Sequence, residues 1–501
     1  MRKCKNVLII VVFVFLVSVL SIPLSADDGN EPPANPWLAD SPWAMSHRNP
    51  YCQASSPYPG PESVKFTSKA DFTSGNPILI TIGISAPYPD GSRVLWGSDA
   101  LYVYKADPSG RRIKYIDKQL KEDLFTNVLS DVSSLMSGAY TLIDKDNIFY
   151  VPKLTKLNAY GDAIEGDPGS DVAVKRSFEI PATMLRAEGE NIVGMNMTYD
   201  GMIAFVTNQG LVGVISRSFD DVYYLALADG DEVSNSIACD EDGGIYVVTS
   251  EKMYRVQWTG TELTTDESKG GWAADYETGD GPSGVRLGAG SGSTPTLMGT
   301  GDQDKFVCIT DGKDLMNITL FWRDKIPSDW NQIEGVKDRR IAAQVPVTFG
   351  DAGATTSLSE QSVCIRGYGA LVVNNQLQSN LKSEALSMLI SGITFNAPYG
   401  AEKFEWDPVA REMKTAWVNE DVSIPNGIPT MSSETGLMYG VGQGLFGIWT
   451  FEALDWETGE SVFTFNYGWS MACNSAFAAT QVGLDGHLYT GTLLGMARMR
   501  P

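Results

Sequence analysis

A Gly- and Ser-rich stretch near the middle of the chain holds three carboxylates that could bind a cation. Residues 272–296 read WAADYETGDGPSGVRLGAGSGSTPT and contain Asp275, Glu277 and Asp280. Calcium prefers carboxylate oxygens, and glycines let backbone N–H groups approach a bound group closely. These three residues are therefore a candidate calcium site. A solvated acidic loop beside a hairpin is the alternative interpretation.

Small polar and charged residues also flank the next apolar strand along the chain. The candidates are Ser293, Thr294, Asp311, Asn317 and Arg323. Hydroxyl, amide and charged groups can orient a polar ligand, and a carboxylate in a perturbed environment can act as acid or base. We expect these residues to form a candidate ligand-binding site on one face of the molecule, with a polar hairpin as the alternative.

The histidine and cysteine contents narrow the chemistry. His47 and His487 are the only histidines. This argues against a Ser-His-Asp triad or a multi-histidine metal site, since each needs imidazoles that converge inside one site. Five cysteines follow the first 26 residues, and none has metal-ligand spacing to another. Their odd number leaves at least one thiol unpaired.

A repeated hairpin dominates the chain. YDGMIAFVTNQGLVGV, ETGLMYGVGQGLFGIW and LDGHLYTGTLLGMARM share an acidic or polar residue, a glycine, an apolar strand, a short turn and a second strand. Weaker copies bring the total to eight, about 56 residues apart on average. Four-stranded units that repeat in this way predict an all-β chain folded as a single eight-bladed β-propeller, with seven blades as the alternative. Two stretches with helical spacing, residues 118–129 and 379–390, are expected as insertions.

The ring must close, because an open propeller would leave edge strands exposed. The last hairpin ends at Met499, two residues before the end of the chain, so its blade needs an outer strand from elsewhere. We expect the N-terminal segment to supply it. The predicted division is a signal peptide at 1–26, an N-terminal segment with the ring-closing strand at 27–65 and the propeller at 66–501. A disulfide between Cys52 and Cys473 is a hypothesis that depends on this closure.

The stretch ALDWETGESVF, residues 453–463, resembles the blade signature of the pyrroloquinoline-quinone-type propeller repeat. In it Asp455 and Thr458 can bond the turn backbone, Gly459 supplies a left-handed residue, and Phe463 is expected to pack between blades. The resemblance identifies the chain as a divergent member of the quinoprotein-like superfamily and supports the propeller prediction.

The resemblance also implies chemistry that the residues of this chain do not match. Quinone-dependent alcohol dehydrogenases of this kind hold the quinone in the central channel, typically under a disulfide between adjacent cysteines, with a tryptophan floor and a bound calcium or lanthanide. Here no two cysteines are adjacent, and no Cys-x-x-Cys-His haem motif is present. We therefore expect no quinone cofactor, while calcium stays possible.

The N-terminal end indicates export. Arg2, Lys3 and Lys5 precede an apolar run over residues 7–24 and small residues up to Ala26, which is the order of a secretory signal. An uncleaved membrane anchor is the alternative. The formal net charge is −23, and removing residues 1–26 would make it −26. Such a surface repels nucleic acid, so we expect no nucleic-acid partner.

These features predict a periplasmic or secreted propeller without a membrane span after signal cleavage. We expect a binding or assembly module that holds a protein or a small molecule on a propeller face. The alternative is an enzyme, either a quinone-dependent dehydrogenase of alcohols or sugars or a calcium-dependent hydrolase of lactones or esters. Fold alone does not decide between them.

Overall fold

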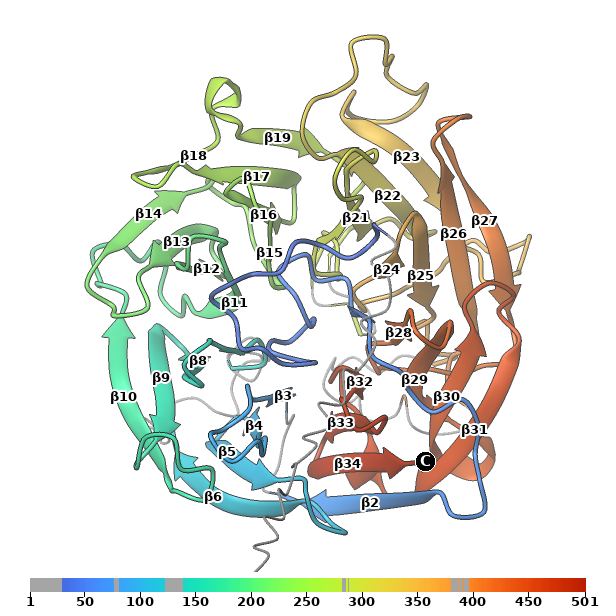
Figure 1. Cartoon of the computed structure of the whole chain (residues 1–501). Helices are drawn as coiled ribbons and strands as arrows, with labels where there is room; N and C mark the ends of the chain where they lie inside the picture. The colour runs from blue at the N-terminus through green and yellow to red at the C-terminus, as the bar shows by residue number, and fades with distance from the viewer. Residues whose placement is uncertain are drawn as a thin grey trace, which may run out of the picture.

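Eight β-sheets surround a central axis in the computed structural model, six of them with four strands and two with five (Figure 1). The structure describes residues 29–75, 81–121, 138–281, 285–286, 288–379, 387, 391 and 396–501. The eight-bladed propeller predicted from the repeat is confirmed, and the seven-bladed alternative is wrong. The predicted export signal lies outside the described residues.

The first four blades follow one another along the chain, each running from an innermost to an outermost strand. Blade 1 contains β3 (Thr81–Ile84), β4 (Leu95–Ser98), β5 (Tyr102–Asp107) and β6 (Lys114–Leu120). Blade 2 contains β7 (Leu142–Ile143), β8 (Phe149–Lys153), β9 (Lys156–Asp162) and β10 (Val172–Glu179). Blade 3 contains β11 (Ile192–Met197), β12 (Ile203–Thr207), β13 (Leu211–Ile215) and β14 (Val222–Ala226). Blade 4 contains β15 (Ala238–Cys239), β16 (Gly244–Val248), β17 (Lys252–Trp258), β18 (Leu263–Thr264), the 3-10 turn η1 (Glu267–Lys269) and β19 (Trp272–Asp275), which also pairs with β17.

The second half of the ring repeats this plan. Blade 5 contains β20 (Thr296–Met298), β21 (Phe306–Thr310), β22 (Asn317–Trp322) and β23 (Ile341–Pro346). Blade 6 contains β24 (Cys364–Arg366), β25 (Gly369–Val373), β26 (Ala401–Asp407) and β27 (Glu412–Asn419). Blade 7 contains β28 (Thr430–Ser432), β29 (Leu437–Gln443), the 3-10 turn η2 (Leu445–Gly447), β30 (Trp449–Asp455) and β31 (Ser461–Gly468). The 3-10 turn η3 (Met471–Cys473) leads to blade 8, with β32 (Gln481–Val482), β33 (Leu488–Thr492) and β34 (Gly495–Arg500).

The hydrophobic pattern changes from the axis to the rim. In blade 3 every residue of β12 (IAFVT) and β13 (LVGVI) is buried. The outer strand β14 (VYYLA) is only partly covered, and the outer strand β10 of blade 2 alternates between exposed and half-buried positions. Strands covered on both faces become continuously apolar, whereas strands at the rim keep polar residues on the solvent side. This gradient explains why the inner hairpins were visible in the sequence.

The N-terminal segment closes the ring, as predicted. Strand β2 (Lys69–Ser74) pairs antiparallel with β34 and is the outermost strand of blade 8. This outer strand begins after the 27–65 segment in which it was predicted. A buried ion pair fixes the junction, since Arg498 Nε and Nη2 donate to Asp71 at 3.1 and 3.2 Å. Arg498 also donates to the Gly110 carbonyl of blade 1, which ties the first blade to the last.

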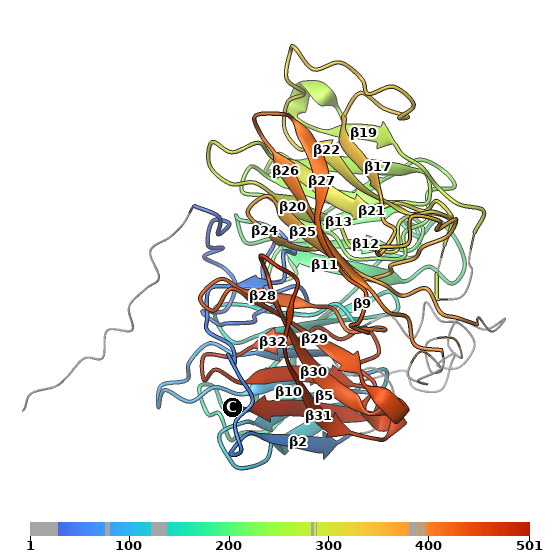
Figure 2. The same cartoon turned by 90° about the vertical axis from the view of Figure 1, so that its right-hand side faces the viewer.

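The two faces of the disc carry different connections (Figure 2). We call one the N-terminal face: it holds the turns that join first to second and third to fourth strands, together with the N-terminal segment. The other, the crossover face, holds the turns between second and third strands and the links from one blade to the next.

Residues 35–58 run along the innermost strands at the N-terminal face and enter the axis. An innermost strand is an edge strand whose unpaired N–H groups need partners. Backbone N–H groups of six blades donate to carbonyls of this segment at 2.8–3.0 Å. The pairs, donor first, are Ile84 to Trp43, Ile143 to Ala44, Cys239 to Pro50, Leu297 to Tyr51, Ile365 to Gln53, and Met431 to Ala54. Strand β1 (Ser55–Ser56) continues as a parallel partner of β28. The segment therefore closes this end of the axis.

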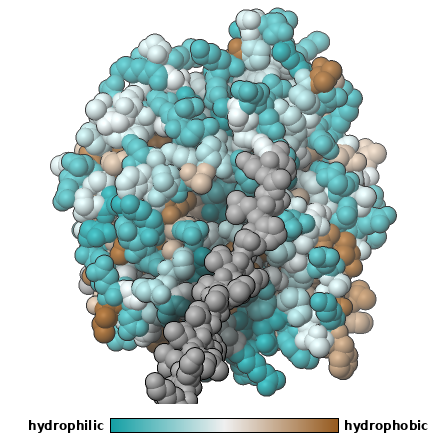
Figure 3. Space-filling view, in the orientation of Figure 1, coloured by the Kyte–Doolittle hydropathy of each residue, from teal (hydrophilic) through white to brown (hydrophobic). Residues whose placement is uncertain are grey.

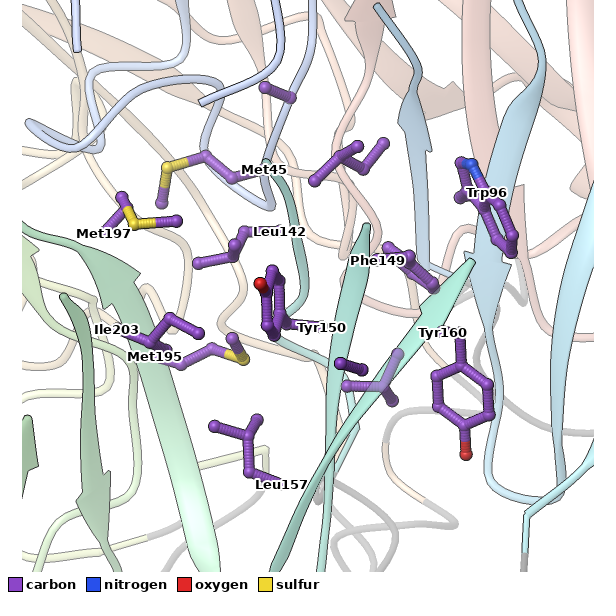
Figure 4. Close-up of a cluster of buried hydrophobic side chains, with 14 of the residues drawn as sticks. Met45, Trp96, Leu142, Phe149, Tyr150, Leu157, Tyr160, Met195, Met197 and Ile203 are labelled. Atoms are coloured by element: carbon purple, nitrogen blue, oxygen red, sulfur yellow. The ribbon is translucent and has the colours of Figure 1, made fainter. Parts of the chain in front are cut away.

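Apolar side chains fill the seams between blades. One cluster joins blades 1, 2 and 3 and includes Trp96, Phe149 and Ile203 (Figure 4). Met45 of the N-terminal segment belongs to this cluster with Leu142, its bridge partner. The segment thus contributes to the core as well as to the hydrogen bonding.

Two details differ from the sequence predictions. Residues 118–120, expected to begin a helix, belong to strand β6, because pairing with β5 overrides a short helical spacing. Most of the other residues of the two stretches with helical spacing lie outside the described residues. The hypothesis of a Cys52–Cys473 disulfide is wrong, since both cysteines are free. The Cys52 thiol donates a hydrogen bond to the Ile237 carbonyl near the axis. Cys473 lies against Gly468 at the crossover edge of blade 7.

Candidate binding site on the propeller axis

The residue two positions before an innermost strand lies at the crossover end of the axis. Tyr140, Ser236, Thr294 and Ser362 hold this position in blades 2, 4, 5 and 6. Because the innermost strands converge on the axis, these residues form part of a ring around it. Thr294 was predicted as a ligand-binding candidate, and the equivalent positions in the other blades were missed.

Tyr140 and His47 lie across this ring. The Tyr140 hydroxyl lies close to the Thr294 side chain and to the Ser236 backbone, and the Ser236 N–H donates to Thr294 Oγ1 at 3.3 Å. The His47 ring, which comes from the N-terminal segment, lies 5.7 Å from the Tyr140 ring, and its Nε2 is 3.5 Å from Ser362 Oγ. Side chains of blades 2, 4, 5 and 6 and of the N-terminal segment therefore meet at one level of the axis.

Burial keeps both aromatic groups uncharged at neutral pH. It lowers the pKa of His47 to about 4, so the imidazole is neutral. It raises the pKa of the Tyr140 phenol above its usual value, so the hydroxyl stays protonated. Neither group is poised to exchange a proton near pH 7.

One carboxylate lies close to this level. Glu360 precedes Ser362 by two residues, and its carboxylate lies so close to Gly292 that a Cβ on that glycine would be 2.1 Å from it. Arg286 Nε is 4.0 Å from Glu360 Oε1, and both side chains are buried. Arg286 also donates to the carbonyls of Gly312 and, at 3.1 Å, Lys313. The glycine of the GSGS stretch is thus required by the close approach of Glu360.

Four of the five predicted ligand-binding residues lie together around blade 5 at the crossover face. Ser293 Oγ accepts the Thr310 N–H at 2.9 Å, which places it beside Asp311. Asp311 accepts both the backbone N–H and the side-chain amide of Asn317, at 2.8 and 2.6 Å. Burial raises the pKa of Asp311 to about 6, although these hydrogen bonds oppose the shift. In this structure the Asp311–Asn317 pair shapes the hairpin between β21 and β22.

Arg323, the fifth candidate, lies on the opposite face. It follows β22, a strand that runs away from the crossover face, and its guanidinium stacks on the Tyr51 ring at 4.9 Å. The Tyr51 hydroxyl donates to Glu241, and the Arg323 carbonyl accepts the indole N–H of Trp272. Arg323 therefore holds the N-terminal segment against blades 4 and 5.

The three predicted calcium ligands are not brought together with one another. Asp275 is exposed and paired with Lys252, Glu277 lies 3.5 Å from Lys337, and Asp280 is exposed. Within the described ranges, no group of three or more His, Cys, Asp or Glu side chains could hold a metal ion. Strand β19 ends at Asp275, and the chain that carries Glu277 and Asp280 is irregular, so proximity in the sequence did not bring the three carboxylates together.

Several buried polar atoms near the axis lack hydrogen-bond partners among the residues that the structure describes. They are Nδ1 of His47, Oε1 of Gln53, and both Nε2 and Oε1 of Gln361. Buried polar groups normally pair with protein, water or a ligand. Unmatched donors and acceptors of uncharged side chains suit a neutral polar molecule or ordered water. Sequence reasoning missed these residues, although the position of Gln361 just before a buried apolar strand was visible.

These residues do not fit a quinone. Tyr140 and His47 span the axis where a flat cofactor would need space, and the five described cysteines are all buried and free. An axial metal partner would need converging carboxylates, whereas the Glu360 carboxylate is held beside Arg286 and the glycine loop. We derive no reaction step through a quinone.

Comparison with known proteins places this geometry in context. No protein-family model matches the chain. It is 46% identical over 483 residues to an uncharacterized protein of Archaeoglobus fulgidus, and the match covers 94% of this chain and 89% of that protein. The chain belongs to the family of that archaeal protein.

Solved structures show the same fold at low sequence identity. The quinohemoprotein alcohol dehydrogenase of Comamonas testosteroni is 12% identical, with a TM-score of 0.51 over 93% of this chain and 80% of that chain. BamB of Moraxella catarrhalis is 9% identical, with a TM-score of 0.49 over 86% of this chain and 97% of that chain. The likeness to the quinohemoprotein alcohol dehydrogenase therefore concerns the fold alone.

No helix within the described ranges is long and apolar enough to span a membrane.

Proposed function

We propose that the chain is an exported, non-catalytic binding or assembly module that receives its partner on the crossover face. One observation carries the proposal: the N-terminal segment closes the axis by accepting backbone N–H groups from six innermost strands. A partner then approaches from the opposite side, where the connections between blades are exposed. Scaffold propellers need a stable ring and an accessible face, and this arrangement supports both.

The groups near the axis support binding over catalysis. General acid-base chemistry needs two groups of suitable pKa in reach of one substrate. His47 is buried with its pKa lowered to about 4, and Asp311 is used by its own hairpin. Glu360 lies beside Arg286, which is bonded to the neighbouring turn. These groups are engaged in holding the structure.

Export is proposed from the sequence of the N-terminus and from the negative charge of the chain. The basic start, apolar run and small residues before Asp27 follow the order of a secretory signal. N-terminal sequencing of the mature protein recovered outside the cytoplasm should begin after Ala26. An intact N-terminus on a membrane-bound protein would contradict cleavage.

Two measurements test the non-catalytic assignment. Purified protein mixed with pyrroloquinoline quinone and calcium should reduce no dye with a panel of alcohols and sugars. It should also hydrolyse no chromogenic ester or lactone above the rate of a heat-treated sample. Turnover in either assay, removed by Glu360→Gln, would overturn the proposal.

Photocrosslinking in the producing cells tests the direction of binding. A benzophenone amino acid is placed at Tyr399 on the crossover face or at Val409 on the N-terminal face; the two side chains are 38% and 93% exposed. We expect a discrete crosslinked product from position 399 and none from position 409. Products from position 409 alone, or from neither position, would contradict the proposed face.

A small neutral polar ligand on the axis is a second candidate function. The unmatched amide of Gln361 and the free nitrogen of His47, within the described part of the chain, favour it. Thermal-shift screening with neutral sugars and amides should then give a stabilising hit that Gln361→Leu removes. A screen in which wild type and Gln361→Leu respond alike would exclude this candidate.

A further inference from the structure

An uncharged apolar patch lies at the crossover edge of blades 7 and 8. Four side chains are unusually exposed: Leu445 at 70%, Phe446 at 83%, Trp469 at 66% and Met471 at 41%. The half-buried Leu493 and Leu494 belong to the turn beside them. We call these six residues the crossover patch. Exposed clusters of large apolar residues mark interaction sites more often than scattered single residues do.

The backbone brings these residues side by side. Trp449, at the start of β30, pairs with Gly468, at the end of β31, so the η2 turn lies next to Trp469. The Leu493 N–H donates to the Asn474 carbonyl at 2.7 Å, and the Leu494 N–H donates to the Ala472 carbonyl at 3.3 Å. These bonds attach the blade 8 turn to η3. The patch is therefore one surface built from three connected turns.

The tip of the patch adopts an unfavourable backbone conformation. Phe446 has φ 61° and ψ 20°, in the left-handed region that glycine or asparagine usually fills. The cost is about 1 kcal/mol or more, and no burial of the ring offsets it. A phenylalanine held exposed in this way suits contact with another molecule.

The charge distribution separates the patch from the rest of the chain. Residues 435–451 and 461–484 contain no Asp, Glu, Lys or Arg, although 20% of the chain is charged. Exposed acidic residues lie beside the patch. Glu420 and Asp421 come just before Ser423 in the chain. The Ser423 carbonyl accepts the N–H of Gln443, two residues before Leu445 of the patch, at 2.9 Å. Glu420 approaches Gly350, which precedes the exposed Asp351. An apolar surface with an acidic border is complementary to apolar residues flanked by basic ones.

The size of the patch favours a peptide over a second copy of the chain. At these exposures the four side chains offer on the order of 400 Å² of apolar surface. A stable protein interface needs about 800 Å² on each partner. An anionic lipid surface is disfavoured because the chain carries a net charge of −23.

We propose that the crossover patch binds a basic polypeptide segment that carries apolar anchor residues. This inference rests on the proposed binding function and names the partner class. Phe446 and Trp469 act as the central contacts, and Glu420, Asp421 and Asp351 attract the basic flanks. Aromatic residues at the centre of an interface carry most of its energy, while bordering charges raise the association rate.

Fluorescence anisotropy with a designed peptide probe tests the inference. The probe is a labelled amphipathic peptide of Leu and Lys, compared with a Leu and Glu peptide of the same pattern. We expect binding of the Lys peptide only, and at least about a tenfold loss of affinity in the triple variant Leu445→Ser, Phe446→Ser, Trp469→Ser. The double variant Glu420→Gln, Asp421→Asn should weaken binding several-fold at low salt and have a smaller effect at high salt.

A matched control uses exposed apolar residues of the opposite face. Phe66, Ile164 and Val409 are 101%, 66% and 93% exposed, and replacing all three by Ser should leave the affinity unchanged. Equal binding by wild type and the crossover triple variant would overturn the inference, as would equal binding of the Glu peptide. Thermal unfolding of both triple variants should match wild type.

Other occupants give distinct results that would also overturn it. A dimer in analytical ultracentrifugation, abolished by the crossover triple variant, would assign the patch to a second copy. Flotation with phosphatidylcholine vesicles, abolished by the same variant, would assign it to lipid. If the inference fails while crosslinks from Tyr399 persist, the proposed function stands and the partner binds elsewhere on that face.

Discussion

The N-terminal and crossover faces of this propeller are built by opposite rules. At the N-terminal face the backbone edges of six innermost strands are paired with residues 35–58, and Trp43 and Tyr51 are fully buried. Where the grey atoms do not cover it, this face is largely hydrophilic with scattered apolar residues (Figure 3). At the crossover face, Phe446 and Trp469 remain exposed. One face is used to close the ring, and the other leaves large apolar side chains exposed to solvent.

The difference has a physical cause. A ring of blades leaves an edge strand around its axis, and every unpaired buried N–H costs free energy. The N-terminal segment satisfies these groups at one end. At the other end the links between blades are loops, whose exposed side chains can vary without opening the ring. The following predictions test this contrast, from the largest expected effect to the smallest.

Removing residues 29–62 should abolish cooperative folding. The deletion removes six axial hydrogen bonds, each worth about 1 kcal/mol, together with the buried side chains of Trp43, Met45 and Tyr51. This loss exceeds the roughly 5–15 kcal/mol stability of a typical domain. Near-ultraviolet circular dichroism and urea unfolding measure the effect. A truncated chain that retains a sharp unfolding transition would show that the segment is an accessory to the fold.

Trp43→Ala should destabilise the chain by about 3–5 kcal/mol, because it leaves a cavity in a fully buried site. Trp469→Ala is the matched change on the crossover face, where the ring is 66% exposed, and should alter stability by less than about 0.5 kcal/mol. Urea unfolding of both variants gives the comparison. Similar losses in the two would remove the contrast between the faces.

Because His47 is buried, the free energy of unfolding should depend on pH. Burial lowers its pKa from 6.5 to about 4, so the unfolded chain binds a proton that the folded chain rejects. Stability from this group is therefore complete above about pH 6.5 and is lost as the pH falls toward 4, by about 3 kcal/mol in full. His47→Gln should remove this loss.

Asp311 acts in the opposite direction and must be separated from His47. Its pKa is raised to about 6 by burial, so its charged form destabilises the fold above that pH and the penalty disappears as the pH falls toward 3.8. The useful quantity is thus the difference in unfolding free energy between wild type and His47→Gln at pH 7.5 and pH 4.5. A difference that does not change with pH would mean that His47 is open to solvent.

The smallest effect is expected at the turn of the repeat signature. Asp455 Oδ1 accepts the backbone N–H groups of Glu457 and Thr458 at 3.0 and 2.8 Å, in an exposed turn of the N-terminal face. Asp455→Ala should cost about 1 kcal/mol, since water replaces these bonds in part. Thermal unfolding measures it, with Glu460→Ala as the control because that side chain is exposed in the same turn. A loss above about 3 kcal/mol would indicate that the turn has a larger role.

Local features of the fold were predictable from the sequence. The eight repeated hairpins and the missing outer strand of the last blade were visible because hairpin turns and strand patterns depend on neighbouring residues. Gly459 shows the limit of such reasoning: its φ of 74° was expected from the turn. A second constraint was not, because a Cβ there would lie 2.4 Å from the Trp417 ring of blade 6.

The candidate site was only partly predictable. Ser293, Asp311 and Asn317 do lie together, because they flank the paired strands of a single blade. Arg323 was grouped with them by sequence distance but lies on the other face, because β22 runs away from the crossover face. Tyr140, His47 and Glu360 come from three separated parts of the chain, so spacing could not connect them.

The sequence by itself determined the repeating unit, the number of blades, the need for a closing strand and the acidic character of the chain, since each depends on residue type and on short-range pattern. Only the tertiary structure decided that residues 35–58 close the axis, that His47 reaches Tyr140, and that Phe446 and Trp469 share one exposed surface. Those outcomes depend on contacts between residues far apart in the chain, which form when the ring closes and bring eight separate blades to one axis.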